Sequence, residues 1–306
     1  MTTPFRMHTV VAALSLAGTM LLSTAHAQNI KIAMVIPTTG ALTQYGDMVK
    51  EGATTAVELA NAAGGINGKK IELVAVDDAC EPKQGPAAAK FIAEKVKPAK
   101  VAVLHDKQSY GQGIAASVRD DLKKAGINVA LFEGINAGDS DYSAVITKLK
   151  SAGIDFVYYG GYHPEMGLLL RQSAEQGLKT RFMGPEGVGN PEVNAIAGPA
   201  VEGMLLTLPA DFAANPKNAA IVKAFKDNKR DPSGAFQLSS YAAAQALIES
   251  IKAVGDNPAK VADHLHKSNI DTAIGNIGWD KKGDLKSFDF QVFQWHKNGS
   301  KSIAAK

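Results

Sequence analysis

Four aromatic side chains and one carboxylate are the residues of this chain best placed to do chemistry. Tyr45, Tyr110, Tyr162 and Phe236 each fall in an expected loop or at the end of an expected element, and Glu186 lies in the sequence GPEG after a short apolar run. A lone aromatic at such a position is usually the edge of a core. Together with one acid, however, four of them can form an apolar pocket for a small ligand that carries an ammonium group.

A glycine pattern offers a different function. Residues 111–116 match G-x-G-x-x-A, and Glu133 follows Gly113 by twenty positions, as in a dinucleotide-binding fingerprint. In that motif the first glycine closes the strand-to-helix turn directly, whereas here Asp106 to Tyr110 intervene. The favoured interpretation is a loop and a helix start that use glycine for tight turning.

The histidines do not predict a metal site. His264 and His266 stand two apart on an expected helix and therefore face different directions. His105 and His163 follow expected strands but have no Cys or His at ligand spacing. The G-x-S-x-G elbow of hydrolases is also missing from the sequence. We expect no catalytic residue, no metal and no cofactor.

Composition and charge indicate an exported globular protein. The 306 residues are 45% apolar and 21% charged, with a formal charge of +3, which gives no reason to expect a nucleic-acid partner. Arg6, the apolar run Val10–Leu22 and the A-x-A site at 25–27 predict a signal peptide over residues 1–27, cleaved after Ala27. The mature chain is then expected in the periplasm.

The single cysteine, Cys80, is unusual for an exported protein, because thiols normally pair in oxidising compartments. Three interpretations stay open: a reactive thiol, a buried apolar cysteine, or a cysteine whose disulfide partner has been lost.

Strands and helices alternate along the first two thirds of the chain, which predicts an α/β fold with doubly wound parallel sheets in two lobes. A run of helices follows from residue 215, and a last strand is expected near the C-terminus. Parallel strands present their carboxyl ends at one edge, so Tyr162 and Glu186 should meet there. The expected strands are 31–36, 70–77, 101–105, 128–132, 154–159, 181–183, 203–208 and 288–295, and the expected helices are 47–62, 86–96, 111–125, 142–152, 164–176, 216–227, 235–253 and 258–267.

Five longer runs resemble one known family. They are DDACEPKQ (77–84), VAVLHDKQSYGQG (101–113), DFVYYGGYHPEMG (155–167), TRFMGPEGVGN (180–190) and KGDLKSFDFQVFQWHKNGS (282–300). They are similar to the leucine and leucine/isoleucine/valine binding proteins of ABC importers, over nearly all of residues 30–306. The resemblance implies a type I periplasmic binding protein: a monomer, not an enzyme, that binds a branched-chain amino acid and presents it to a membrane permease.

The resemblance also implies an organisation and roles for the candidate residues. The first lobe comprises residues 28–84 and 210–275, the second 85–209 and 276–306, and a hinge joins them. Glu186 matches the acid that pairs with the ligand's α-ammonium group. Tyr110 and Tyr162 match aromatics that close over the ligand, and Tyr45 matches one that covers its side chain. Phe236 occupies a position that is often tyrosine.

The chain departs from this family after Gln84, where residues 85–90 resemble the start of the second lobe. The resemblance implies an internal deletion of about two βα units, ~60 residues. That part normally supplies the Ser and Thr that bind the ligand's carboxylate, and the disulfide partner of Cys80. We therefore expect an incomplete first lobe and impaired binding. The alternative is a non-binding remnant or interaction protein that docks a partner through its intact second lobe.

Overall fold

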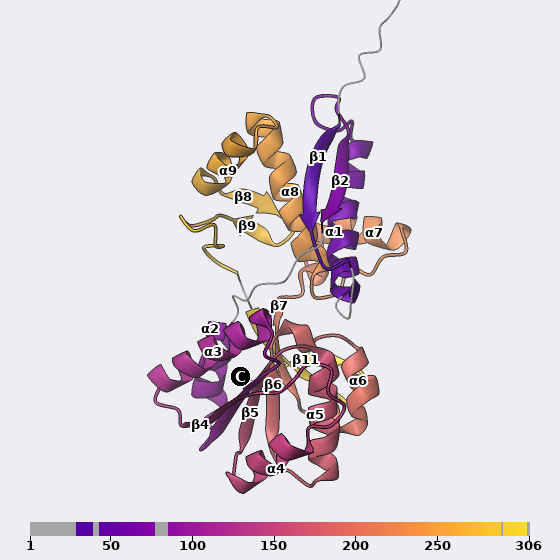
Figure 1. The fold of residues 1–306 in the computed structure, drawn as a ribbon. Helices are drawn as coiled ribbons and strands as arrows, with labels where there is room; N and C mark the ends of the chain where they lie inside the picture. The colour runs from indigo at the N-terminus through magenta and orange to yellow at the C-terminus, as the bar shows by residue number, and fades with distance from the viewer. Residues whose placement is uncertain (1–28, 39–42, 77–84, 289, 305–306) are drawn as a thin grey trace, which may run out of the picture.

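The computed structural model describes residues 29–38, 43–76, 85–288 and 290–304, which form two α/β lobes. In Figure 1 the smaller first lobe lies above the larger second lobe, and the chain passes between them more than once. The expected signal peptide and Cys80 lie outside the described residues. Among the residues that are described, no helix is long and apolar enough to cross a membrane.

The second lobe is built on a seven-stranded sheet in the order β11-β10-β7-β6-β5-β3-β4, with β3 to β7 parallel. Its strands are β3 (Val101–His105), β4 (Val129–Gly134), β5 (Phe156–Gly160), β6 (Arg181–Gly184), β7 (Leu205–Pro209), β10 (Phe290–Trp295) and β11 (Lys301–Ile303). Its helices are α2 (Gly85–Phe91), α3 (Ser109–Lys124), α4 (Ser143–Ser151), α5 (His163–Glu175) and α6 (Glu192–Ala197).

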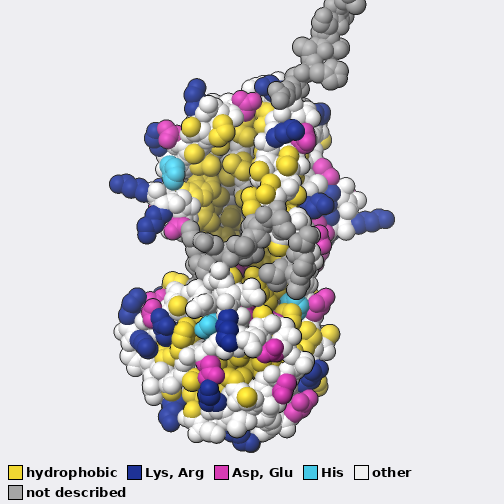
Figure 2. Space-filling view, in the orientation of Figure 1, with side chains coloured by type: hydrophobic (Ala, Val, Ile, Leu, Met, Phe, Trp, Pro, Cys, Tyr) yellow, Lys and Arg dark blue, Asp and Glu magenta, His cyan; other side chains and the backbone are white. Residues whose placement is uncertain are grey.

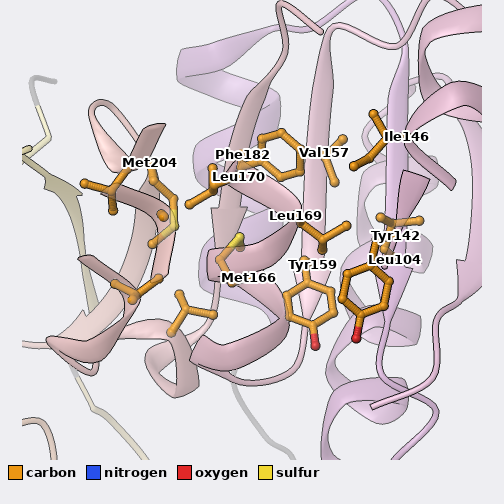
Figure 3. Packing of buried hydrophobic residues seen from close by; sticks show 14 of the residues in the cluster. Leu104, Tyr142, Ile146, Val157, Tyr159, Met166, Leu169, Leu170, Phe182 and Met204 are labelled. Atoms are coloured by element: carbon orange, nitrogen blue, oxygen red, sulfur yellow. The ribbon is translucent and has the colours of Figure 1, made fainter. Parts of the chain in front are cut away.

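Helices cover both faces of this sheet, because its central strands are apolar on both sides. Alternate residues of β5 enter two different cores: Val157 and Tyr159 pack with α4, α5 and α6, whereas Phe156 and Tyr158 pack with α2 and α3. Figure 3 shows the first of these cores, where Met166 and other α5 side chains lie against the strands. The predicted α/β class and doubly wound packing are confirmed.

The C-terminal strand joins the sheet in the opposite direction to its neighbours. β10 pairs antiparallel with β7, and the short β11, which the sequence did not predict, pairs antiparallel with β10. The strand end is anchored by Trp295, which is fully buried and donates its indole N–H to the carbonyl of Val188 at 3.3 Å. The sheet is therefore mixed, with a parallel centre and an antiparallel edge.

The first lobe has a much smaller sheet. Its two parallel strands, β1 and β2, pack on one face against α1 and α8, and one apolar core holds these elements together with α7 and α9. The elements are β1 (Ile30–Val35), α1 (Thr43–Ala62), β2 (Ile71–Val76), α7 (Ala219–Asp227), α8 (Gln237–Val254), α9 (Pro258–Lys267) and the hairpin β8 (Ile270–Thr272) and β9 (Gly275–Ile277).

No helix or strand of the described residues covers the outer face of this small sheet. β1 alternates strictly between buried and exposed residues, and the last three residues of β2 are all exposed. Val35 is 55% exposed, Val74 37% and Val76 46%. Large apolar side chains at this exposure on neighbouring strands form a patch of the kind that marks an interaction surface or an aggregation risk.

Two local predictions differ from the structure. The first helix was expected to begin at residue 47, but α1 begins at Thr43, so Tyr45 stands on its first turn. Gly46 permits this early start, because a Cβ there would collide with the carbonyl oxygen of Pro37. The β8–β9 hairpin was not predicted, and it extends to Ile277, two residues past the lobe boundary expected at 275.

Candidate functional site

The candidate residues come from both lobes and meet at the facing ends of the two. Tyr110 stands on the first turn of α3 after β3, Tyr162 immediately precedes α5 after β5, and Glu186 follows β6. These three lie beyond the carboxyl ends of parallel strands, as expected for a ligand site in such a sheet. Tyr45 and Phe236 come from the first lobe, at the starts of α1 and α8.

The four aromatic rings form one continuous cluster. Tyr162 stands between Tyr110, with ring centroids 5.2 Å apart, and Tyr45, at 5.4 Å. Phe236 meets Tyr45 edge-on at 5.8 Å. These are favourable separations for aromatic pairs, so the rings form a wall that an apolar side chain can pack against. The role of each residue toward a ligand stays a prediction.

Glu186 lies behind this wall and is only 5% exposed. Its Oε1 accepts a hydrogen bond from the Tyr110 hydroxyl at 2.7 Å, whereas its buried Oε2 has no hydrogen-bond partner in the described part of the chain. Burial raises the pKa of Glu186 to about 7, and the bond from Tyr110 opposes that rise. A buried carboxylate oxygen of this kind can accept a hydrogen bond from a cationic group.

Glu186 also affects the hydroxyls around it. Burial, and then the nearby Glu186 charge, raise the pKa of both Tyr110 and Tyr45 well above the usual tyrosine range. The two phenols therefore stay neutral at any physiological pH. Glu186 is the group in this aromatic cluster whose charge changes near neutral pH.

Tyr45 also connects the lobes through its hydroxyl group. The hydroxyl donates to the carbonyl oxygen of Gly187 at 2.6 Å and lies 2.9 Å from Nδ1 of His163. Since the single hydroxyl proton is used toward Gly187, His163 must donate its Nδ1 proton to the phenol oxygen. Burial lowers the pKa of His163, with Glu192 opposing, so the neutral ring is favoured.

Three polar residues that the sequence did not single out extend this contact. Nε2 of Gln44 lies 3.3 Å from Nε2 of His163, and the Gln44 side-chain oxygen accepts a hydrogen bond from Asn190. The carboxylate of Glu192 lies 3.1 Å from the same Nε2 and can accept a hydrogen bond from it only when the His163 ring is doubly protonated. Only closeness in the sequence to the candidate residues could have indicated Gln44 and Asn190, since Gln44 precedes Tyr45 and Asn190 follows Glu186 by four positions. We call Gln44, Tyr45, His163 and Asn190 the interlobe contact.

The glycine pattern at 111–113 serves packing. Gly111 lies in the first turn of α3, where a Cβ would collide with a side-chain oxygen of Asp106 and with the carbonyl oxygen of Gly160. The glycine therefore lets α3 approach the ends of β3 and β5 closely. Within the described ranges, no three His, Cys, Asp or Glu side chains come together as a metal site requires.

Comparison with known proteins agrees with this two-lobed arrangement. The family described as "Periplasmic binding protein" matches in two stretches, residues 29–90 and 82–300. The chain is 44% identical to the leucine-, isoleucine-, valine-, threonine- and alanine-binding protein of Pseudomonas aeruginosa, covering 97% of this chain and 98% of that protein. It is 42% identical to the Leu/Ile/Val-binding protein of Escherichia coli K12, covering 91% and 94%.

Solved structures share the fold. A leucine-binding protein LivK from Thermotoga maritima superposes with a TM-score of 0.78 at 23% identity, over 90% of this chain and 98% of that chain. The substrate-binding protein LivJ from Streptococcus pneumoniae, solved with isoleucine, also gives 0.78, at 20% identity over 90% and 99%. The two-lobed fold expected from the sequence is therefore the fold of these binding proteins.

Proposed function

We propose a binding role for this chain, which belongs to the periplasmic binding protein family: it takes up a branched-chain amino acid between its lobes for delivery to the permease of an ABC importer. Its relatives at 41–44% identity are named for binding leucine, either together with isoleucine and valine or alone. The proposed site comprises Tyr45, Tyr110, Tyr162, Glu186 and Phe236.

The observation that carries this proposal is the free oxygen of Glu186. Oε2 is buried beside an aromatic wall and lacks a hydrogen-bond partner among the described residues. An unpaired buried carboxylate is costly, and an α-ammonium group would satisfy it with a charge-assisted hydrogen bond. The rings of Tyr45, Tyr162 and Phe236 would then cover an aliphatic side chain. Because the pKa of Glu186 is about 7, affinity for an ammonium ligand should rise with pH up to that value.

We further propose that binding is impaired by an internal deletion after Gln84. The alignment with the Pseudomonas aeruginosa protein runs over 365 positions, more than the 306 residues present here, so part of that relative has no counterpart. The two family matches overlap at residues 82–90, which run from the segment after β2 into α2. If the absent part held the ligand's carboxylate, that charge is left without partners, which costs several kcal/mol.

Export completes the proposal. The family and the relatives are periplasmic binding proteins, and we propose that residues 1–27 are the signal peptide removed after Ala27. The division into a first lobe of 28–84 with 210–275 and a second of 85–209 with 276–306 also stays a proposal. With no catalytic constellation expected from the sequence, we propose binding without covalent chemistry.

Calorimetry tests the proposal most simply. Residues 28–306 are titrated with leucine, isoleucine and valine, beside a chimera that carries, between Gln84 and Gly85, the Pseudomonas aeruginosa segment opposite the gap. We expect the chimera to bind leucine at least about a hundredfold more tightly, since several kcal/mol are recovered. Glu186→Gln in the chimera should abolish the gain. Tight binding by the unaltered chain would overturn the deletion proposal, and no binding by the chimera would overturn the proposed ligand class.

A second function deserves a test because the second lobe is complete, with both faces of its sheet covered. In that case the chain is a non-binding remnant that docks a partner through this lobe. A pull-down with the permease of the same importer, with and without leucine, separates the two. Capture that responds to leucine supports the transport role, and equal capture in both samples supports the remnant.

A further inference from the structure

One edge of strand β1 carries unused backbone groups. Within the described residues β1 pairs only with β2, through bonds such as Ile30 N–H to Lys70 C=O at 2.9 Å. In a parallel pair alternate residues point to the same neighbour, so the N–H and C=O groups of Lys31, Ala33 and Val35 point to the opposite edge. A free edge of this kind is a template for another strand.

An apolar groove of about 700 Å³ runs along this edge. β1 contributes one wall, and α8 and α9 contribute the other, as the hollow lined with hydrophobic side chains in the upper lobe of Figure 2 shows. Charged residues stand at its ends, where Lys69 and Asp256 form an ion pair of 3.4 Å. The main apolar lining residues are Ile30, Ile32, Leu247, Ile251, Val261 and Leu265.

The shape of this surface fits a strand with an attached helix. An added strand would bond to the free edge of β1 and turn one apolar face toward α8 and α9. A helix attached to that strand would cover the opposite face of the sheet, where Val35, Val74 and Val76 are exposed. A second copy of this chain fits poorly. If its β1 paired with the β1 described here, the α8 and α9 of the second copy, which cover the same face of the sheet, would collide with the α9 of the first copy.

We propose that this surface docks a strand–helix segment supplied by another polypeptide, of the kind that relatives carry between the counterparts of β2 and α2. The proposal deepens the proposed function and rests on its deletion. It is supported by the length of the alignment with the Pseudomonas aeruginosa relative and by the division of the family match into two stretches that overlap at residues 82–90. A gap of at least ~60 residues corresponds to about two βα units, which supply both a strand and a helix.

The test uses the Pseudomonas aeruginosa segment opposite the gap as a labelled peptide, titrated with residues 28–306 and followed by fluorescence anisotropy. We expect saturable binding of one peptide per chain. Hydrogen exchange should show that the amides of Lys31, Ala33 and Val35 become protected, while the Ile32 amide, already bonded to β2, changes little. A scrambled peptide serves as the composition control.

Three variants locate the binding. Ala33→Pro removes a free-edge N–H that β2 does not use, and proline is tolerated at such edge positions. Ala262→Lys places a charge in the groove, and Ala259→Lys is its match on the same helix outside the groove lining. The first two should weaken binding at least about tenfold and the third less than about twofold. If Ala33→Pro fails to fold by circular dichroism, the lysine pair decides.

The experiments distinguish failure of the docking proposal from failure of the proposed function. Absence of saturable binding, or equal effects of the two lysine variants, overturns the docking proposal, as does a dimer of the chain that Ala262→Lys dissolves. A docked peptide with no leucine binding by the covalent chimera overturns the proposed function alone. Leucine binding by the chimera without docking of the free peptide leaves the function standing and overturns docking.

Discussion

Strand β1 of the first lobe and strand β3 of the second have similar apolar sequences but different surroundings. β3 is buried at all five positions, with helices on both faces, whereas β1 exposes every second residue. Parallel strands that are covered on both sides have nearly continuous apolar sequences. IKIAMV in β1 and IELVAV in β2 each contain a single charged residue. These sequences fit a sheet covered on both faces, but the first lobe covers one.

The same asymmetry extends to the proposed site. The second lobe supplies Glu186, Tyr110 and Tyr162. These residues follow strands of one sheet, and Tyr110 contacts both of the others. The first lobe contributes Tyr45 and Phe236 from helix starts. Among the described residues, the lobe that carries Glu186 has a sheet covered on both faces, whereas the lobe facing it has a sheet covered on one. Four experiments test this difference between the lobes.

Core truncation should show the largest difference between lobes. Leu104→Ala removes a fully buried side chain of β3 and should lower the free energy of unfolding of the second lobe by about 3 to 4 kcal/mol. Ile32 of β1 lines the open groove, where water can fill the space left by a smaller side chain. Ile32→Ala should therefore lower the free energy of unfolding by less than half as much as Leu104→Ala. Urea unfolding followed separately for each lobe measures both. Ile303→Ala, at an exposed site, is the control, and equal costs in β1 and β3 would refute the contrast.

Titration of Glu186 should give an effect of similar size. Its pKa is raised from 4.5 to about 7, so the folded state holds a proton that the unfolded state has lost. Stability is therefore complete below pH 4.5 and decreases as pH rises through 7, by about 3 kcal/mol in all. Unfolding curves between pH 5 and 8 measure this loss.

Two variants check the assignment to Glu186. Glu186→Gln should remove the part of the pH dependence that comes from Glu186 and leave a smaller part from Asp106, because burial raises the pKa of Asp106 to about 6. Tyr110→Phe should move the midpoint upward, because the bond from Tyr110 favours the charged carboxylate. A loss of stability that persists unchanged in Glu186→Gln would assign the titration to another group.

The interlobe contact should contribute less. Tyr45→Phe keeps the ring in the aromatic cluster and removes the hydroxyl that bonds to Gly187 and His163, at a cost of about 1 kcal/mol. The lobes should separate more often, which small-angle scattering would detect as a larger radius of gyration. Tyr241→Phe, inside the first lobe, is the matched control. An unchanged radius in Tyr45→Phe would show that the hydroxyl does not hold the lobes together.

Substitution on the uncovered face should change stability least. Val74→Lys lies on the exposed face of β2 and should shift the free energy of unfolding by less than about 0.5 kcal/mol. It should nevertheless reduce aggregation, because it interrupts the exposed valine patch. Light scattering during storage measures this effect. Ile303→Lys, at a more exposed position on the second lobe, should leave aggregation unchanged, and equal improvement by both variants would contradict a patch confined to the first lobe.

Much of the fold was predictable from local sequence. Val101–His105 is a strand at the residues expected, and Pro258–Lys267 a helix, because Asn257 and Pro258 are strong helix-start residues. The start of α1 was missed because Gly46 looks like a loop residue until its contact with Pro37 is known. Three-residue strands such as β8 are too short to show a period of two.

The proposed site was less predictable than the fold. The positions after β5 and β6 indicated that Tyr162 and Glu186 would meet, because parallel strands end at one edge. Nothing local distinguishes His163 or Asn190 from other polar loop residues. Their contacts with Gln44 exist because two lobes approach each other, which is a property of the tertiary fold.

We infer that the chain keeps an acid, Glu186, that would bind an ammonium group and lacks the groups that would bind a carboxylate. The most direct test compares leucine with 3-methylbutylamine, which is leucine without its carboxyl group, by calorimetry on residues 28–306 at pH 8. Leucine should bind at least about tenfold more weakly than the amine, because its carboxylate would be buried without partners at a cost of several kcal/mol. Leucine binding more than about a hundredfold tighter than the amine would show a satisfied carboxylate site and contradict the claim.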